Sequence, residues 1–123
     1  MENNIKIVRF KDGIDVICKI TVEEELGIID IEDPMEFQIH NANLMIQQWL
    51  PIAVAKENKV RVRINDVLCI YEPNNSFQEY YEGLVSKINE VVESNDVRNA
   101  SVEKIKELIE ALEEIPSDGT LVH

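Results

Sequence analysis

The chain has 123 residues, 45% of them hydrophobic, and carries 24 acidic residues against 12 basic ones, for a net charge of −12. This length and this apolar fraction predict one globular domain with a proper core. The acidic balance disfavours nonspecific binding to nucleic acid or to anionic membranes. No segment approaches the roughly 18 apolar residues of a membrane-spanning helix. The start, MENNIKIV, has no basic segment followed by an apolar run, so it predicts no signal peptide.

The first half of the chain is predicted to form strands. Residues 5–10 make a short apolar strand and Gly13 allows a tight turn. Over residues 14–22, apolar side chains at every second position share one face, and Asp15, Lys19 and Thr21 point the other way. A third strand over 28–32 is broken or bent by Asp33 and Pro34, and can resume over 35–40 beyond a bulge. Residues 41–43 turn the chain into a further strand over 44–50.

Residues 60–73 carry the most informative pattern. Val60, Val62 and Ile64 alternate with Arg61 and Arg63, which predicts a strand with one apolar and one charged face. The next two residues, an asparagine and an aspartate, favour a tight reversal. The unbroken apolar run over 67–71 then predicts a strand that is buried on both faces.

Two amphipathic helices are predicted after Pro73. Phe77, Tyr81, Leu84 and Ile88 are spaced by four, three and four residues, which places them on one helical face that should be buried. A second stripe follows over 102–112, and residues 117–123 resemble a frayed tail. The sequence therefore predicts a mainly β, α+β fold. An antiparallel barrel fills residues 1–73, a helical extension that packs on the barrel or on a neighbouring subunit fills 74–115, and a tail fills 116–123.

The two cysteines, Cys18 and Cys69, both lie in apolar strand patterns. Buried free thiols in a reducing cytoplasm are the predicted state, and a disulfide between neighbouring strands is the alternative.

Two segments resemble the signature of the Sm-like (Lsm/Hfq-type) family. One is the strand, Lys-Asp-Gly turn and alternating strand that begins at Val8, and the other is the Arg-containing turn between the strands over 60–64 and 67–71. Across residues 5–80 the order of motifs is similar to that of small Sm-like proteins of tailed phages, especially cyanophage-type ones. The shared motifs are Asp33-Pro34, Trp49-Leu50-Pro51 and Tyr71-Glu72-Pro73. Cys18 and Ile64 stand where the family has glycine.

The resemblance implies a strongly bent antiparallel sheet and assembly into a homo-oligomeric ring through edge strands. The predicted subunit interface consists of apolar residues of the last two strands: Val60, Val62, Val67, Leu68 and Ile70. Single-stranded RNA is the implied ligand, with Arg61, Arg63, Asn65 and Trp49 as candidate contacts. For the two arginines the alternative is a solvated strand face paired with glutamates, and for Trp49 it is packing at a corner.

No catalytic motif was found, so we expect a noncatalytic protein without a cofactor. His40 has no second ligand at metal-binding spacing, and Cys18 has no histidine near it in sequence. An acidic cluster, Glu23, Glu24, Glu25, Asp30, Glu32, Asp33 and Glu36, lacks the ligand spacing of a calcium loop, and the default is a solvated surface. The function alternative to the ring is an acidic interaction module of phage origin that binds a host or viral protein. Either protein would act in the cytoplasm, which is that of the host bacterium if a phage encodes it.

Overall fold

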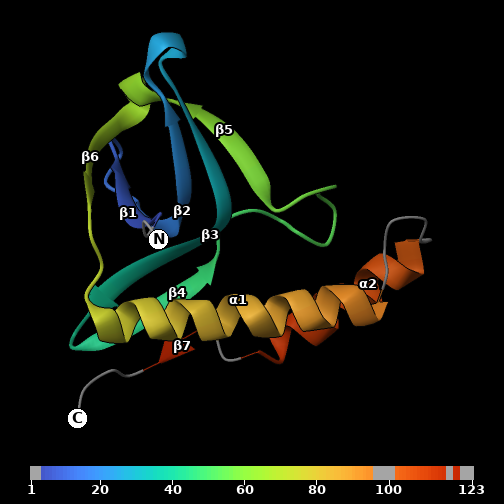
Figure 1. Cartoon of the computed structure of the whole chain (residues 1–123). Helices are drawn as coiled ribbons and strands as arrows, with labels where there is room; N and C mark the ends of the chain where they lie inside the picture. Colours follow the sequence, from blue (N-terminus) through green and yellow to red (C-terminus); the bar gives the residue numbers. More distant parts are fainter. Residues whose placement is uncertain (1–3, 96–101, 116–117, 120–123) are drawn as a thin grey trace.

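A computed structural model describes residues 4–95, 102–115 and 118–119, and it shows an antiparallel sheet followed by two helices (Figure 1). The strands are β1 (Ile5–Phe10), β2 (Asp15–Glu23), β3 (Ile28–His40), β4 (Asn43–Gln48), β5 (Lys59–Arg63), β6 (Val67–Tyr71) and β7 (Asp118–Gly119). The 3-10 turns are η1 (Glu24–Leu26) and η2 (Ile64–Asp66), and the helices are α1 (Asn75–Asn95) and α2 (Val102–Glu113). The predicted α+β class and the order of strands before helices are confirmed.

The sheet is open. Its hydrogen-bonded order is β6-β1-β2-β3-β4-β7, and β5 lies beside the path by pairing with β3. The long strand β3 pairs with β2 along one edge. Its other edge has two partners, because residues 28–32 pair with β5 and residues 35–40 pair with β4. Among the described strands, β5 pairs only with β3 and β6 only with β1, so the predicted barrel is not closed within one chain.

Asp33 and Pro34 divide β3 between its two partners, as the sequence predicted. Asp33 has a φ of 52°, and the β2–β3 register shifts between Ile17 and Lys19 on the facing strand. Three segments hold this bend. Lys19 Nζ lies 3.1 Å from the Asp33 carboxylate, Asn58 Nδ2 lies 3.4 Å from it, and the Tyr81 hydroxyl donates to the Asp33 carbonyl at 2.6 Å. The bend therefore fixes α1 against the sheet.

Opposite faces of β1 and β2 pack into two different cores. The strand core, enclosed by the sheet itself, contains Val8, Phe10, Val16, Cys18, Ile29 and Ile31. The helix-side core joins Ile5, Ile7, Ile17 and Met35 of the sheet to apolar residues of both helices. This division follows from the alternation of side chains along each strand.

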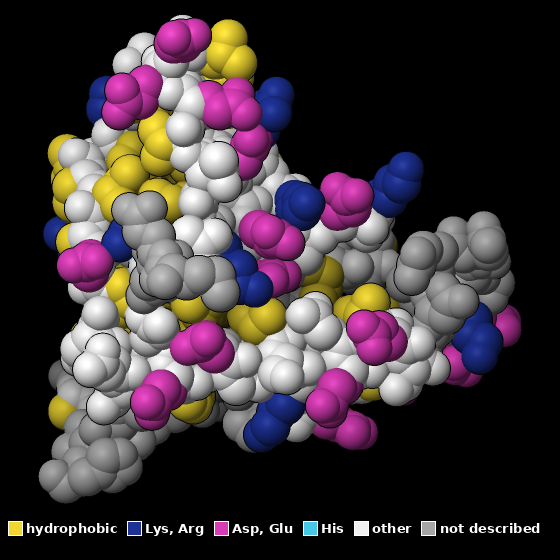
Figure 2. All heavy atoms as spheres, in the orientation of Figure 1, with side chains coloured by type: hydrophobic (Ala, Val, Ile, Leu, Met, Phe, Trp, Pro, Cys, Tyr) yellow, Lys and Arg dark blue, Asp and Glu magenta, His cyan; other side chains and the backbone are white. Residues whose placement is uncertain are grey.

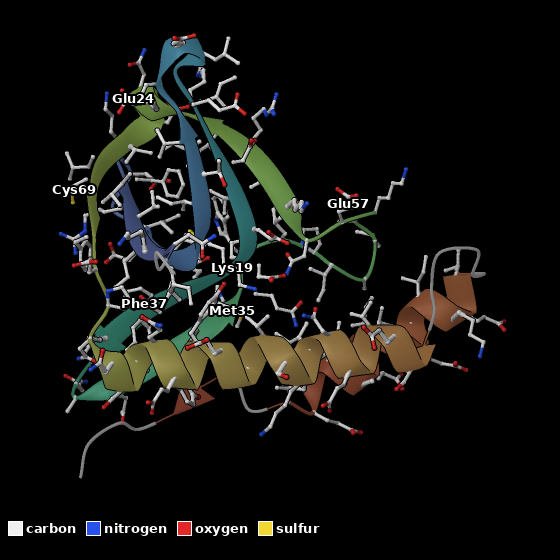
Figure 3. All side chains as sticks on the ribbon, viewed as in Figure 1. Lys19, Glu24, Met35, Phe37, Glu57 and Cys69 are labelled. Atoms are coloured by element: carbon white, nitrogen blue, oxygen red, sulfur yellow. The ribbon has the colours of Figure 1, made fainter. Side chains whose placement is uncertain are left out.

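Helix α1 lies across the sheet and presents the predicted stripe to it (Figure 1). The Asn74 side chain caps the helix by accepting a hydrogen bond from the Phe77 N–H at 2.9 Å. Figure 3 shows Met35 and Phe37 between the sheet and α1, and the Phe37 and Phe77 rings meet edge to face at 4.8 Å. The predicted burial is confirmed for all four stripe residues, Phe77, Tyr81, Leu84 and Ile88.

Helix α2 packs along α1 and buries Leu108 and Leu112. None of the described helices is long and apolar enough to cross a membrane. Most of the predicted tail lies outside the described residues, but Asp118 and Gly119 form β7, which pairs with Leu44 and Met45 of β4.

Candidate functional site

Strand β5 pairs on one side only among the described residues, with β3, and it carries the candidate RNA-binding arginines. Val60 and Val62 are half-buried against the strand core, whereas Lys59, Arg61 and Arg63 are exposed. This alternation matches the sequence prediction. It arises because β5 has the core on one face and solvent on the other.

Both arginines form ion pairs with nearby aspartates. The Arg61 guanidinium donates two hydrogen bonds to the Asp30 carboxylate on β3, at 2.8 and 3.3 Å. This pairing holds the pKa of the Asp30 carboxyl below its usual range. Arg63 lies 3.3 Å from Asp66 in η2, and both side chains are mostly exposed. Exposed pairs of this kind contribute little stability and open readily. A phosphate that binds here would therefore compete with a carboxylate at each guanidinium.

The other two RNA-contact candidates lie in different environments. Asn65 is exposed in η2, two residues after Arg63. The Trp49 ring stacks on Phe10, with ring centroids 5.1 Å apart and planes 28° from parallel, and its backbone N–H donates to the Pro34 carbonyl. One face of the indole is thus occupied by a core residue, as the packing alternative for Trp49 predicts. One continuous segment, from β5 into η2, carries Arg61, Arg63 and Asn65. Trp49 packs against Phe10 instead.

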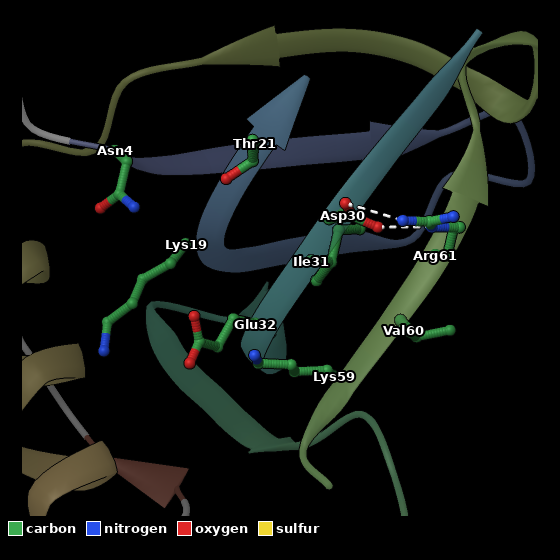
Figure 4. Close-up of a pocket in the computed structure, with 9 residues that line it drawn as sticks. All are labelled: Asn4, Lys19, Thr21, Asp30, Ile31, Glu32, Lys59, Val60 and Arg61. Carbon is green, nitrogen blue, oxygen red and sulfur yellow. Dashed lines mark hydrogen bonds and ion pairs between the residues drawn. The ribbon is translucent and has the colours of Figure 1, made fainter. Parts of the chain in front are cut away.

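A cavity of about 470 Å³ lies over the outer surface of β2, β3 and β5 (Figure 4). Its charged residues alternate across the strands: Lys19 on β2, Asp30 and Glu32 on β3, and Lys59 and Arg61 on β5. Lys19 is engaged with Asp33 and Arg61 with Asp30. Such alternation across paired strands is a stabilising arrangement for exposed charges. Within the described residues, no three His, Cys, Asp or Glu side chains are grouped to hold a metal ion.

Strand β6 also pairs on one side only among the described strands, and the structure corrects the prediction that it is buried on both faces. Leu68 is 62% exposed, Ile70 40% and Tyr71 37%. Hydrophobic side chains reach the surface along this strand and beside it (Figure 2). The physical reason is position: β6 pairs with β1 on one side only, and a bulge at Arg9 and Phe10 turns Leu68 away from the strand core.

A cation–π contact and an ion pair hold β6 against β1. The Arg9 guanidinium of β1, which binds Asp15 of β2 through two hydrogen bonds, lies 5.7 Å from the centre of the Tyr71 ring of β6. Beyond the end of the strand, Lys6 Nζ lies 2.8 Å from the Glu72 carboxylate. Among the described strands β6 pairs with β1 alone, so its other edge has no strand partner there.

The two cysteines differ, so the prediction of two buried thiols is half wrong. Both are free, but Cys18 is buried in the strand core and Cys69 is exposed on β6 (Figure 3). Burial raises the pKa of the Cys18 thiol to about 12. Cys69 is exposed because it occupies the outer face of an edge strand.

We expect the two thiols to react at very different rates with a disulfide reagent such as DTNB at pH 8. One equivalent, Cys69, should react quickly, and the second should react only after denaturation, because the thiolate is the reactive species. Cys69→Ser should lack the fast phase altogether. Equal rates for both thiols in the folded protein would contradict this assignment.

In comparisons with known proteins, no family model matches the chain and no curated protein is significantly similar to it.

Proposed function

We propose that this chain is a noncatalytic Sm-like protein that assembles into a homo-oligomeric ring through the free edges of β5 and β6. The observation that carries the proposal is the exposure of an apolar edge strand, β6, in a sheet whose β5 edge is also free. Unpaired edge strands with exposed apolar side chains promote association unless something covers them. Pairing the β5 edge of each copy with the β6 edge of the next covers both edges and generates a closed ring when the rotation permits.

The arrangement of the two signature-like turns supports the Sm-like part of the proposal. The Lys11 N–H donates to the Asp66 carbonyl at 3.0 Å, and the Ile64 N–H donates to the Gly27 carbonyl at 2.9 Å. These bonds join the turn after β1 and the turn before β3 to η2, the turn between β5 and β6. A strongly bent barrel, completed only in the assembly, is the fold that we propose on this basis.

RNA binding is the less supported part of the proposed function. Arg61 and Arg63 are paired with aspartates, the protein carries a net charge of −12, and acidic Glu24 and Glu25 lie in the neighbouring turn η1. Each of these features weakens the attraction for phosphate. We therefore propose weak binding of single-stranded RNA at Arg61, Arg63 and Asn65, with a smaller contribution from the partly buried Trp49.

A host or viral protein partner is the second candidate. The observation that favours it lies on α2. Val102 is 66% exposed and Ile109 is 40% exposed, and the same helix carries four glutamates and two lysines. An exposed apolar pair in an acidic helix could be covered by a protein surface of basic and apolar character.

The test is the mass of the full-length protein by light scattering, with and without a short U-rich RNA at low salt. We expect one discrete multimer of the 14.2 kDa chain. A further increase with RNA would support the RNA part, and an unchanged mass would remove it while the ring remains. A monomer would overturn the ring and leave the protein-partner alternative.

A further inference from the structure

We propose that the cavity on the outer surface of β2, β3 and β5 is a binding site for a small zwitterion, a molecule of amino-acid size that carries one ammonium and one carboxylate group. This inference goes beyond the proposed function and does not rest on it, because the site uses a face of the sheet whereas the proposed assembly uses strand edges. With a volume of about 470 Å³, the cavity falls within the range of small-molecule sites in proteins.

Two rows of side chains cross the cavity from strand to strand. The first row is Thr21, Asp30 and Arg61, and the second row is Lys19, Glu32 and Lys59. Residues directly opposite each other on paired strands share a face of the sheet and lie within reach of one another. Figure 4 shows the charged ends of the second row on one side of the cavity and the aspartate–arginine pair of the first row on the other.

The two rows differ in how their charges are paired. In the first row, two hydrogen bonds of 2.8 and 3.3 Å join the guanidinium to the aspartate. In the second row, Lys19 turns to the Asp33 carboxylate, 3.1 Å away. Among the side chains that the structure describes, Glu32 and Lys59 form neither an ion pair nor a hydrogen bond, although they lie directly opposite each other. The second row therefore presents this carboxylate and this ammonium group to a ligand.

The bend of β3 holds the backbone on which Glu32 and Lys59 stand. The Asp33 N–H donates to the Asn58 carbonyl at 2.9 Å, and the Asn58 side-chain amide lies 3.4 Å from the Asp33 carboxylate. These bonds fix the residue after Glu32 against the residue before Lys59. A site whose backbone is already in place loses less freedom on binding than a site that must be ordered by its ligand.

The charges of the cavity select the class of ligand. The lining contains three cations and two carboxylates, a net charge of +1 in a chain whose net charge is −12. A simple anion would be repelled by Glu32, and a simple cation would be repelled by Lys59. A zwitterion satisfies both, because its ammonium group can donate to Glu32 while its carboxylate accepts from Lys59. Asn4 and Thr21 line the same cavity and can form hydrogen bonds with a polar side chain of the ligand.

The test is saturation-transfer NMR of the full-length protein with glutamine, a zwitterion with a polar side chain. The comparison probes are N-acetylglutamine, which lacks the ammonium group, and glutaminamide, which lacks the α-carboxylate. We expect glutamine to bind and each analogue to bind at least about tenfold more weakly, because a hydrogen bond to a charged group contributes about that factor. The absence of saturation transfer to glutamine would overturn the proposal, and an analogue that binds as well as glutamine would refute the zwitterion class.

Two variants locate the binding at the second row. Glu32→Gln and Lys59→Gln each remove one charge from an exposed position, and each should weaken glutamine binding by at least about tenfold. The matched controls, Glu57→Gln and Lys56→Gln, make the same charge changes at exposed positions of the preceding loop, outside the cavity lining, and should bind glutamine as the unmodified protein does. Equal losses in variants and controls would mean that binding follows net charge, which would refute this site. Light scattering of the same samples reports assembly separately, so loss of glutamine binding leaves the ring standing and a monomeric mass leaves the site standing.

Discussion

Replacing Leu68 by lysine is expected to dissociate the proposed ring into 14.2 kDa monomers. Leu68 is 62% exposed in the single chain, so the substitution should cost little folding stability. In the proposed assembly the neighbouring copy would cover this side chain, and an ammonium group at that position would lose hydration. Lysine on an edge strand is also a device by which natural sheets prevent edge-to-edge pairing. We expect the association to weaken by at least about tenfold, or about 1.4 kcal/mol, measured by light scattering across a dilution series.

Leu26→Lys is the matched control. Leu26 is 65% exposed, nearly the same as Leu68, but it lies in η1 and not on a free strand edge. The control should leave the mass unchanged, and circular dichroism should show both variants folded. If both variants, or neither, changed the mass, the β6 edge would not be the contact.

The exposure of β6 shows where the sequence stops being informative. The run from Val67 to Tyr71 correctly predicts a strand, because apolar β-branched and aromatic residues fit a half-buried pleated surface. Whether both faces are covered depends on which strands lie beside it, and that is decided by residues far away in the sequence. Position at the edge explains both the exposed Leu68 and the exposed Cys69, and no local pattern distinguishes an edge strand from a central one.

A strand or helix face that is buried at a regular interval can be predicted from the spacing of its apolar residues. Residues 14–22 were predicted as an alternating strand and the structure has β2 over Asp15–Glu23. The bend at Asp33 and Pro34 was likewise predicted from chemistry that interrupts a ladder. The hydrogen bond from the Tyr81 hydroxyl to the Asp33 carbonyl was not predicted, because the two residues are 48 positions apart and meet only once α1 has packed on the sheet.

The candidate site was predictable in part for the same reason. The alternation of Arg61 and Arg63 with valines placed both side chains outside the core. The pairing of these arginines with carboxylates was predicted only as a general alternative, because the aspartate that binds Arg61 lies on β3, 31 residues away. Register between strands, rather than composition, decides which cations remain available for a ligand.

Leu84→Ala is expected to cost about 2–5 kcal/mol of the free energy of unfolding. Leu84 is 5% exposed in the helix-side core, where α1 joins the apolar residues of both the sheet and α2. The truncated side chain would leave a cavity that a rigid strand and two helices can only partly close. Urea unfolding at a fixed protein concentration, followed by circular dichroism and by the fluorescence of the single Trp49, measures the loss.

Ile109→Ala on α2 is the comparison, because Ile109 is 40% exposed and its truncation leaves no enclosed cavity. We expect a loss well below that of Leu84→Ala. Equal losses, or a loss for Leu84→Ala below about 1 kcal/mol, would mean that α1 is not a structural part of the domain. If Leu84→Ala lowers stability but the folded variant keeps its multimeric mass at low temperature, the helix supports the sheet while the strand edges alone carry assembly. Loss of the multimer in a variant that is still folded would instead assign α1 a share of the subunit contact.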